Sequence, residues 1–239
     1  MTSELFREDG YLASCEATVT HVVELGDNKA VVVDQTVFYP MGGGQPGDSG
    51  SLIRRGGASD ARVAVVACYR ADNQHLHVLE TGATPPDVGE TVTLEIDWQR
   101  RHRLMRMHSC MHMLCVVVPA PVTGGSIRDG SGRLDFDLPD PPDKLVVEAE
   151  LNRLIQEDHA MRLSWITDQE MLEQPELVRT MSVAPPMGSG RVRLVEFGSA
   201  DLQPCGGTHV ASTAEIGPVK VASIKKKGKQ NRRITVEFA

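Results

Sequence analysis

Two pairs of potential metal ligands lie far apart in the chain and share the same spacing. His108 and His112 are four residues apart in a segment free of Gly and Pro, and Cys205 and His209 bracket the run Cys-Gly-Gly-Thr-His. Side chains at positions i and i+4 of a helix project from the same face, so the first two imidazoles can converge on one ion. Three imidazoles and a thiolate suit tetrahedral zinc. We therefore predict one zinc site that contains all four residues.

Each pair taken alone has a less specific interpretation. Histidines on an apolar helix face are commonly core residues with hydrogen-bond partners, and a free cysteine often packs as a small apolar side chain. The two pairs together carry more weight, because the chain has only eight histidines and five cysteines. Cys110 lies on the opposite side of the expected helix, and Cys115 is expected to pack in the core, so neither is predicted to be a ligand.

The residue that follows the first histidine limits the chemistry. Zinc proteases of the His-Glu-x-x-His type have a Glu general base there, whereas this chain has Ser109. A peptide hydrolase is therefore disfavoured. A small-ester hydrolase is also disfavoured, because the C-terminal end of the chain is strongly basic.

A glycine-rich run at 42–48, Gly-Gly-Gly-Gln-Pro-Gly-Asp, follows an apolar segment. Consecutive glycines allow positive φ and a close approach of the backbone to a ligand. The run lacks the Lys-Ser/Thr ending of a phosphate-binding loop and the Gly-x-Gly-x-x-Gly pattern, so it gives no support for ATP or NAD binding. It is either a tight connection between strands or the wall of a pocket in which Gln45 offers an amide donor and acceptor.

The elements expected to position these residues fall into two blocks. Val- and Thr-rich runs separated by turn residues predict strands at 17–24, 30–38, 61–69, 75–79 and 91–96. Short strands at this spacing indicate a small barrel or an open sheet. We place a domain boundary near Asp97, which gives a β-rich domain at 1–97 and a metal-binding domain at 98–239.

The second block mixes helices and strands, so the fold class is predicted to be α+β. An uninterrupted helix is expected at 99–118, followed by a Gly-rich segment at 123–132. Further helices are predicted at 143–159 and 168–173, and strands at 133–138, 161–167, 192–197, 219–225 and 233–238. The helix at 99–118 carries one face composed of Leu104, His108, Met111, His112 and Cys115.

Composition excludes several classes of protein. The chain has 239 residues, 41% of them hydrophobic, and no run approaches the ~18 apolar residues of a membrane helix. The N-terminus lacks the apolar region of a signal peptide. The five cysteines are odd in number and unevenly spaced, which favours reduced thiols or metal ligands over a disulfide framework. A cytoplasmic, membrane-free protein is expected.

The net charge of -7 conceals a basic end. No acidic residue stands between Ile216 and Val236, and seven Lys and Arg lie in that stretch. Arginines also crowd the start of the expected helix at 99–118. These segments are either ordinary solvated surfaces or a surface that contacts nucleic-acid phosphates. Aromatic residues make up only 4%, so platforms that stack single-stranded bases are not expected.

The motifs, in this order, resemble a known family. Val-Phe-Tyr-Pro-Met-Gly-Gly-Gly-Gln-Pro-Gly-Asp at 37–48, His108-x3-His112 and Cys205-Gly-Gly-Thr-His209 resemble the editing domain of alanyl-tRNA synthetase, and more closely the free-standing alanyl-tRNA editing proteins of the AlaX group. The resemblance covers roughly residues 31–238. It implies a barrel-like domain that carries the glycine motif, joined to the second additional domain shared by alanyl- and threonyl-tRNA synthetases.

The resemblance also implies an activity. Similar proteins bind zinc through the positions of His108, His112, Cys205 and His209. They hydrolyse the ester that joins serine or glycine to alanine tRNA, and forms of this length are associated with serine. We expect Gln45 to lie near the editing pocket. Only about thirty residues precede the matching region, so no catalytic core for aminoacylation is expected in this chain.

Further residues are predicted for selectivity and for tRNA binding. A pocket that hydrogen-bonds a hydroxyl rejects an alanyl group, because its own polar atoms would then stay unpaired. Thr36 and Thr208 are candidates for that role beside Gln45. The residues predicted to contact tRNA are Arg100, Arg101, Lys225, Lys226, Lys227, Lys229, Arg232 and Arg233.

Four points stay open at the level of sequence, the first of which is the number of zinc ligands. A catalytic zinc usually keeps one position free beside three protein ligands, whereas this chain offers four. The general base, the preference between serine and glycine, and the oligomeric state have no signal. A non-catalytic, zinc-stabilised tRNA-binding module is the alternative function.

Overall fold

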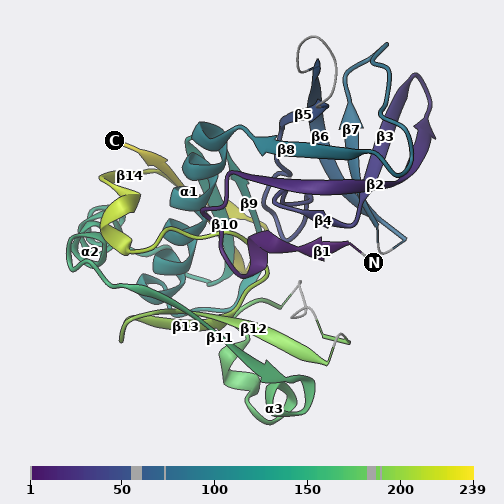
Figure 1. Cartoon of the computed structure of the whole chain (residues 1–239). Helices are drawn as coiled ribbons and strands as arrows, with labels where there is room; N and C mark the ends of the chain where they lie inside the picture. Colours follow the sequence, from purple (N-terminus) through teal and green to yellow (C-terminus); the bar gives the residue numbers. More distant parts are fainter. Residues whose placement is uncertain (1, 55–60, 73, 182–186, 189) are drawn as a thin grey trace. The chain divides into compact units, whose positions relative to one another are not determined.

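The computed structural model describes residues 2–54, 61–72, 74–181, 187, 188 and 190–239, which form two compact units. One unit comprises Met1–Gly42 and Pro46–His102, and the other comprises Gly43–Gln45 and Arg103–Ala239. Helix α1 (Trp98–Val117) begins in the first unit and continues into the second (Figure 1). The glycine-rich run is thus divided, with a tripeptide of it belonging to the second unit.

The first unit contains a closed barrel with the strand order β2-β3-β7-β6-β5-β8 (Figure 1). This confirms the predicted small barrel. The strands are β2 (Ser14–Leu25), β3 (Asn28–Val33), β5 (Gly50–Arg54), β6 (Ala61–Ala71), β7 (Gln74–Leu79) and β8 (Thr91–Ile96). Beside them, β1 (Ser3–Glu4) pairs in parallel with β4 (Gln35–Thr36), and the 3-10 helix η1 (Leu5–Arg7) follows β1.

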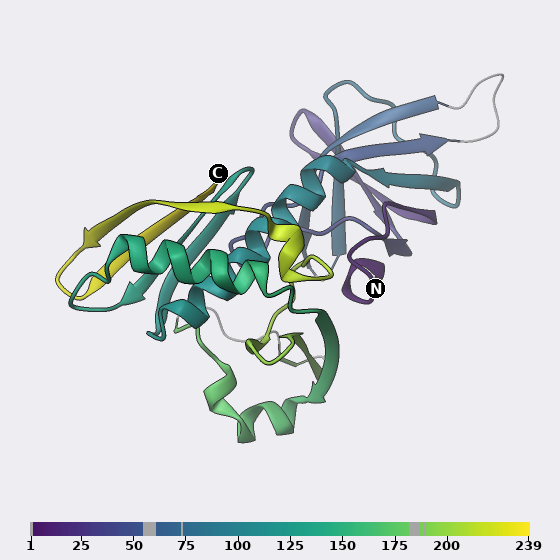
Figure 2. The same ribbon diagram turned by 90° about the vertical axis from the view of Figure 1, so that its left-hand side faces the viewer.

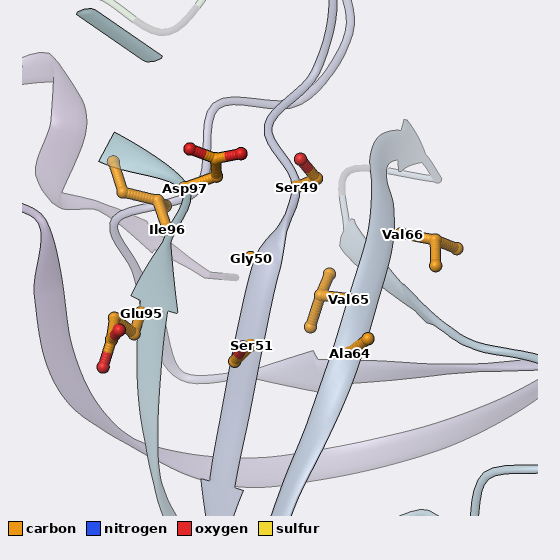
Figure 3. A pocket seen from close by; sticks show the side chains of 9 residues that line it. All are labelled: Ser49, Gly50, Ser51, Ala64, Val65, Val66, Glu95, Ile96 and Asp97. Atoms are coloured by element: carbon orange, nitrogen blue, oxygen red, sulfur yellow. The ribbon is translucent and has the colours of Figure 1, made fainter. Parts of the chain in front are cut away.

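The barrel closes where β5 meets β8. A Cβ atom at Gly50 would lie 2.1 Å from the carbonyl oxygen of Glu95, so only glycine permits this approach. A hollow of about 530 Å³ lies beside this junction, and Figure 3 shows the side chains that line it. It is lined by Ser49, Gly50, Ser51, Ala64, Val65, Val66, Glu95, Ile96 and Asp97, a set without histidine or cysteine.

A buried ion pair fixes the chain on the C-terminal side of the glycine-rich run. Arg101 and Asp48 are 0% and 1% exposed, and the Nε atom of Arg101 donates to both carboxylate oxygens, at 3.0 and 3.1 Å. The guanidinium also donates to the carbonyl oxygens of Gly10 and Val37, at 2.9 and 2.7 Å. The backbone N–H of Tyr39 donates to Asp48 at 2.7 Å. Three chain segments are therefore held at one charged side chain.

Inside the same unit, His77 is held in the neutral form. Its Nδ1 lies 3.1 Å from the carbonyl oxygen of Val31, and its Nε2 lies 2.8 Å from the hydroxyl of Thr36. Burial lowers the pKa of His77 to about 4, against an ordinary value of 6.5. A charged imidazole is therefore unfavourable at this position.

This burial predicts that acid destabilises the barrel. Between pH 6.5 and 4 the unfolded chain binds a proton that folded His77 does not, so the free energy of unfolding falls as the pH drops through this window. By pH 4.5 the loss from this residue is expected to be about 2–3 kcal/mol. Denaturant unfolding at pH 7 and 4.5 should reveal a smaller acid-induced loss in His77→Gln than in the wild type. Equal losses would contradict the assignment.

The second unit is built on an antiparallel sheet with the order β14-β15-β10-β9. Its strands are β9 (Val122–Arg128), β10 (Ser131–Asp137), β14 (Val219–Lys227) and β15 (Asn231–Phe238). Helix α2 (Lys144–Gln156) lies along this sheet (Figure 2), where Asn152 bonds both the N–H and the carbonyl of Val219. Asp143 caps α2 by accepting the N–H groups of Leu145 and Val146.

A smaller antiparallel sheet, β11-β12-β13, completes this unit. Its strands are β11 (Met161–Thr167), β12 (Arg191–Phe197) and β13 (Asp201–Pro204). Helix α3 (Asp168–Glu173) and the 3-10 helices η2 (Pro175–Leu177) and η3 (Thr213–Ile216) connect the strands. The arrangement confirms the α+β fold class. Within the described residues, no helix has the length and apolar character needed to cross a membrane.

Candidate metal centre

The second unit brings the two predicted ligand pairs together. Helix α1 carries His108 and His112, and the loop after β13 carries Cys205 and His209. One potential ligand atom from each of the four lies within 4.8 Å of all the others. The Sγ of Cys205 is 3.6 Å from the Nε2 of His108 and 3.2 Å from the Nε2 of His209. The cluster therefore converges on one point.

The loop that carries Cys205 and His209 is held by a buried arginine of β12. Arg193, 2% exposed, donates to the carbonyl oxygen of Cys205 at 2.8 Å and also to that of Gly207. The N–H of Gly207 points at the sulfur of Cys205, 3.4 Å away. A Cβ at Gly207 would lie 2.2 Å from the Cε1 of His108, so the loop packs against the imidazole only because this residue is glycine.

The Nδ1 atom of each imidazole in the cluster, on the side of the ring away from Nε2, lies near a different oxygen atom. The Nδ1 atom lies 2.7 Å from Gln45 Oε1 for His108, 3.1 Å from Asp201 Oδ2 for His112 and 3.2 Å from Ser109 Oγ for His209. An Nδ1–H donated to these oxygens leaves each Nε2 lone pair free for a metal ion. Second partners of this kind are typical of metal-ligating histidines.

The donor atoms fit a tetrahedral metal ion. Bonds of 2.0–2.3 Å to nitrogen and sulfur separate neighbouring ligand atoms by about 3.3–3.7 Å, close to the two distances measured from Cys205 Sγ. Burial opposes ionisation of Cys205, but electrostatic interactions with His108 and His209 and side-chain hydrogen bonds outweigh it and hold the thiol pKa well below its ordinary value. The thiolate is the metal-binding form of cysteine. The identity of the ion stays a prediction.

The other two cysteines of α1 are not part of the cluster. Cys110 and Cys115 are 0% and 7% exposed and pack in the core. Burial raises the pKa of each thiol to about 12, so both are protonated at neutral pH.

Gln45 lies directly behind the cluster and is 1% exposed. Its Oε1 accepts from the Nδ1 of His108 and from the N–H of Thr208, the latter at 3.2 Å, and its Nε2 donates to the Thr208 hydroxyl at 2.9 Å. The preceding Gly44, with φ +83°, accepts the N–H of Ile127 in β9 at 2.8 Å. The glycine run thus anchors Gln45 on β9 and joins it to both ligand pairs.

The candidates for selectivity occupy different surroundings. Thr208 is 1% exposed and bonded to Gln45 next to the cluster. Thr36 belongs to the first unit, where its hydroxyl bonds His77 and accepts the N–H of Phe38 at 3.0 Å.

The predicted tRNA-binding residues also differ in exposure. Arg101 is buried against Asp48, and Arg232 is 8% exposed and donates to the carbonyl of Asn231. Arg100 donates to the carbonyl of Gly47 at 2.7 Å, and Arg233 makes two bonds of 2.7 Å to Asp135. The lysines at the β14–β15 turn are exposed, namely Lys225, Lys226, Lys227 and Lys229.

Three residues of this site had no signal in the sequence. Asp201 and Ser109 contact the histidines, and Arg193 holds the loop, yet none of them belongs to a motif by spacing. Asp201 lies 89 positions from the histidine it contacts. A carboxylate four residues before a candidate ligand is the only hint that could have suggested it.

Two family models match the chain. The second additional domain of threonyl and alanyl tRNA synthetases matches residues 192–235, and class II (A) tRNA synthetases match residues 11–100. The alanyl-tRNA editing protein AlaX-M of Methanosarcina mazei is 35% identical over 242 residues, which cover 98% of this chain and 95% of the relative. AlaX-M of Saccharolobus solfataricus is 31% identical, with 98% of both chains covered. The alanine–tRNA ligase of Pyrobaculum arsenaticum is 37% identical over 94% of this chain, but over 25% of the ligase.

Proposed function

Because the chain belongs to the family of free-standing alanyl-tRNA editing proteins, we propose that it is a hydrolase that removes wrongly attached amino acids from alanine tRNA. Serine is the proposed main substrate and glycine the second. The observation that carries the proposal is the cluster of three oriented imidazoles and Cys205 beside the paired Gln45 and Thr208. The reaction cleaves the ester between the amino acid and the terminal ribose.

We propose that zinc is the metal held by His108, His112, Cys205 and His209. When bound, zinc supplies positive charge that polarises the ester carbonyl or lowers the pKa of a water molecule. The chain's own contribution is to keep the three Nε2 atoms aimed inward through Gln45, Asp201 and Ser109, and to hold the ligand loop through Arg193.

Gln45 and Thr208 provide a basis for selectivity. The Nε2 of Gln45 has a second N–H beyond the one given to Thr208, and the Thr208 hydroxyl has its own proton. Within the described residues, neither proton has an acceptor. A seryl hydroxyl would accept one of them, whereas the methyl group of an alanyl ester offers no acceptor and would leave it unpaired. A glycyl ester also lacks this acceptor, which agrees with its place as the second substrate. In this proposal correctly charged tRNA is spared for that reason.

The proposed contacts to the tRNA backbone lie on four exposed lysines and two half-buried arginines. The turn lysines have no carboxylate partner among the described residues, so they are available to phosphate oxygens at no cost in broken ion pairs. The proposed set is Arg100, Lys225, Lys226, Lys227, Lys229 and Arg233. Arg101 and Arg232 are left out of it because both are buried. Binding through such residues weakens steeply with salt.

Deacylation of alanine tRNA charged with serine, glycine or alanine tests the proposal directly. The purified chain should hydrolyse the seryl ester fastest and the glycyl ester next, and it should spare the alanyl ester. Prior treatment with a strong chelator should abolish turnover, and added zinc should restore it. Intact seryl and glycyl esters after incubation with zinc-loaded protein would refute the proposal.

A further inference from the structure

Among the described residues, the Nδ1 atom of only one of the three imidazoles contacts a carboxylate. Asp201, at the start of β13, is 4% exposed, and its Oδ2 lies 3.1 Å from the Nδ1 of His112. The same oxygen accepts from the Nε2 of Gln203 at 2.6 Å. We propose that Asp201 is the positioning residue that fixes His112 and raises the affinity of the cluster for a divalent cation. The inference rests on the metal centre of the proposed function.

The comparison with the other two acceptors supports this role. Gln45 and Ser109 present neutral oxygens to His108 and His209, and the Ser109 hydroxyl oxygen also accepts the N–H of Val210 at 3.2 Å. A carboxylate is the stronger acceptor because it carries a full negative charge. It polarises the N–H of its imidazole and so makes the opposite nitrogen a better donor to a metal. His112 is therefore the most strongly directed ligand of the cluster.

The charge of Asp201 is only partly compensated within the protein. Its Oδ1 lies 3.1 Å from the guanidinium of Arg179, but within the described residues no donor is aligned with that oxygen. A buried carboxylate costs free energy unless it is paired and fully hydrogen-bonded. A divalent cation on the far side of His112 would offset the remaining charge. Because Arg179 compensates the charge of Asp201 only in part, a bound divalent cation would be stabilised by the remaining negative charge.

Arg179 is itself held in place. Its guanidinium donates to the carbonyl oxygen of Cys115 in α1 at 3.2 Å, and its own carbonyl accepts the N–H of Val122 in β9 at 2.9 Å. The countercharge of Asp201 is therefore tied to two elements of the unit. If Asp201 only joined β13 to α1, replacing its charge would change the stability of the fold and leave metal affinity alone. The two roles predict different measurements.

The test compares the zinc affinity of the wild-type chain with those of its variants, each measured by competition with a chromophoric chelator. Asp201→Asn keeps the shape of the side chain and removes its charge, and it is expected to weaken zinc binding about 10–100-fold. Asp140→Asn makes the same chemical change at an exposed position and should leave the affinity unchanged. In zinc-loaded protein, the NMR resonance of the His112 Nδ1 proton should move upfield in Asp201→Asn alone.

A second variant tests the sign of the effect. Arg179→Gln removes the countercharge and leaves the cluster and Asp201 in place, so zinc should bind several-fold more tightly. If Asp201 and Arg179 only stabilise the fold, Arg179→Gln should bind zinc more weakly than the wild type. That result would overturn the inference. So would an Asp201→Asn affinity within twofold of the wild type, with or without a loss of thermal stability in the metal-free chain.

The outcome is separable from that of the proposed function, because zinc affinity is measured without tRNA. A wild type that binds zinc tightly but leaves seryl esters intact would refute the proposed activity, and the role of Asp201 would stand. If the wild type deacylates normally and Asp201→Asn binds zinc as tightly as the wild type, only the role of Asp201 is refuted.

Discussion

Replacing Cys205 by Ala is expected to lower deacylation of seryl alanine tRNA by at least about 100-fold, while the fold and the tRNA affinity are kept. The sulfur faces the Nε2 atoms of His108 and His209 at 3.6 and 3.2 Å, so its loss removes one of four donors and the only anionic one. Losses of 10–100-fold follow even when a partner behind a metal ligand is removed, so removing a ligand should exceed them. Single-turnover deacylation at saturating protein measures the effect.

The controls for this variant decide between the two functions considered. Circular dichroism and tRNA binding at low salt should match the wild type, because the backbone carbonyl at 205 still accepts from Arg193. Cys110→Ala, a buried thiol of the same unit outside the cluster, should retain activity at moderately reduced stability. A Cys205→Ala protein that deacylates at the wild-type rate would exclude this cluster as the site of hydrolysis. A wild type that binds tRNA without turnover would favour the non-catalytic module.

Asp48→Ala is expected to destabilise the first unit by about 3–5 kcal/mol. The change leaves the charge of Arg101 buried at 0% exposure without its carboxylate, which is the costly way to break a buried ion pair. The N–H of Tyr39 loses its acceptor as well. Urea unfolding of the metal-free chain, followed by the fluorescence of Trp98 with Trp165 replaced by Phe in every protein compared, measures the loss.

The double variant Asp48→Ala with Arg101→Met provides the control. Removing both charges also removes the unpaired one, so a substantial part of the lost stability should return. If Asp48→Ala costs less than about 1 kcal/mol, or if the double variant is the less stable of the two, the pair does not hold these segments in the way described.

Much of the fold could be predicted where the local pattern and the packing agree. The strand Met161–Thr167 and the helix Asp168–Glu173 have the bounds expected from sequence, because Thr167 and Glu170 form a capping box at the junction. The strand expected at 30–38 is shorter. Asp34 interrupts it by accepting the N–H groups of Thr18 and Gln35 through its side chain, at 2.8 Å each.

Besides the two-residue strand β1, three described strands were not predicted, and each of these three depends on contacts that are distant in sequence. β5 begins at Gly50, a poor strand former that β8 nevertheless requires. β9 was expected to be only a Gly-rich segment, yet a Cβ at Gly125 would lie 2.8 Å from Leu134 of β10, so glycine is what permits the pairing. β13 is short and ends in Pro204. In all three, tertiary packing outweighs intrinsic propensity.

The candidate site divides in the same way. The convergence of the four candidate ligands could be predicted, because the helical repeat and the repeated spacing mark which side chains form the two pairs. The acceptors behind them could not be predicted, since nothing local marks Asp201 or Ser109 as the partner of a histidine about 90–100 positions away. Gln45 was suggested by resemblance, but its hydrogen bonds to His108 and to Thr208, which lies between Cys205 and His209, appear only in three dimensions.

The hydrogen bond between Gln45 and Thr208 spans 163 positions of the chain, and this separation bears on how the protein is made. During synthesis, Gln45 and both histidines of α1 leave the ribosome long before Cys205 and His209 exist. The strands of the barrel precede α1 in the chain, whereas the contact between Gln45 and Thr208 can form only after residue 208 has emerged. Contacts of such long range are slow to form. In the proposed function, a metal ion can therefore be held by all four residues only after Cys205 and His209 have emerged.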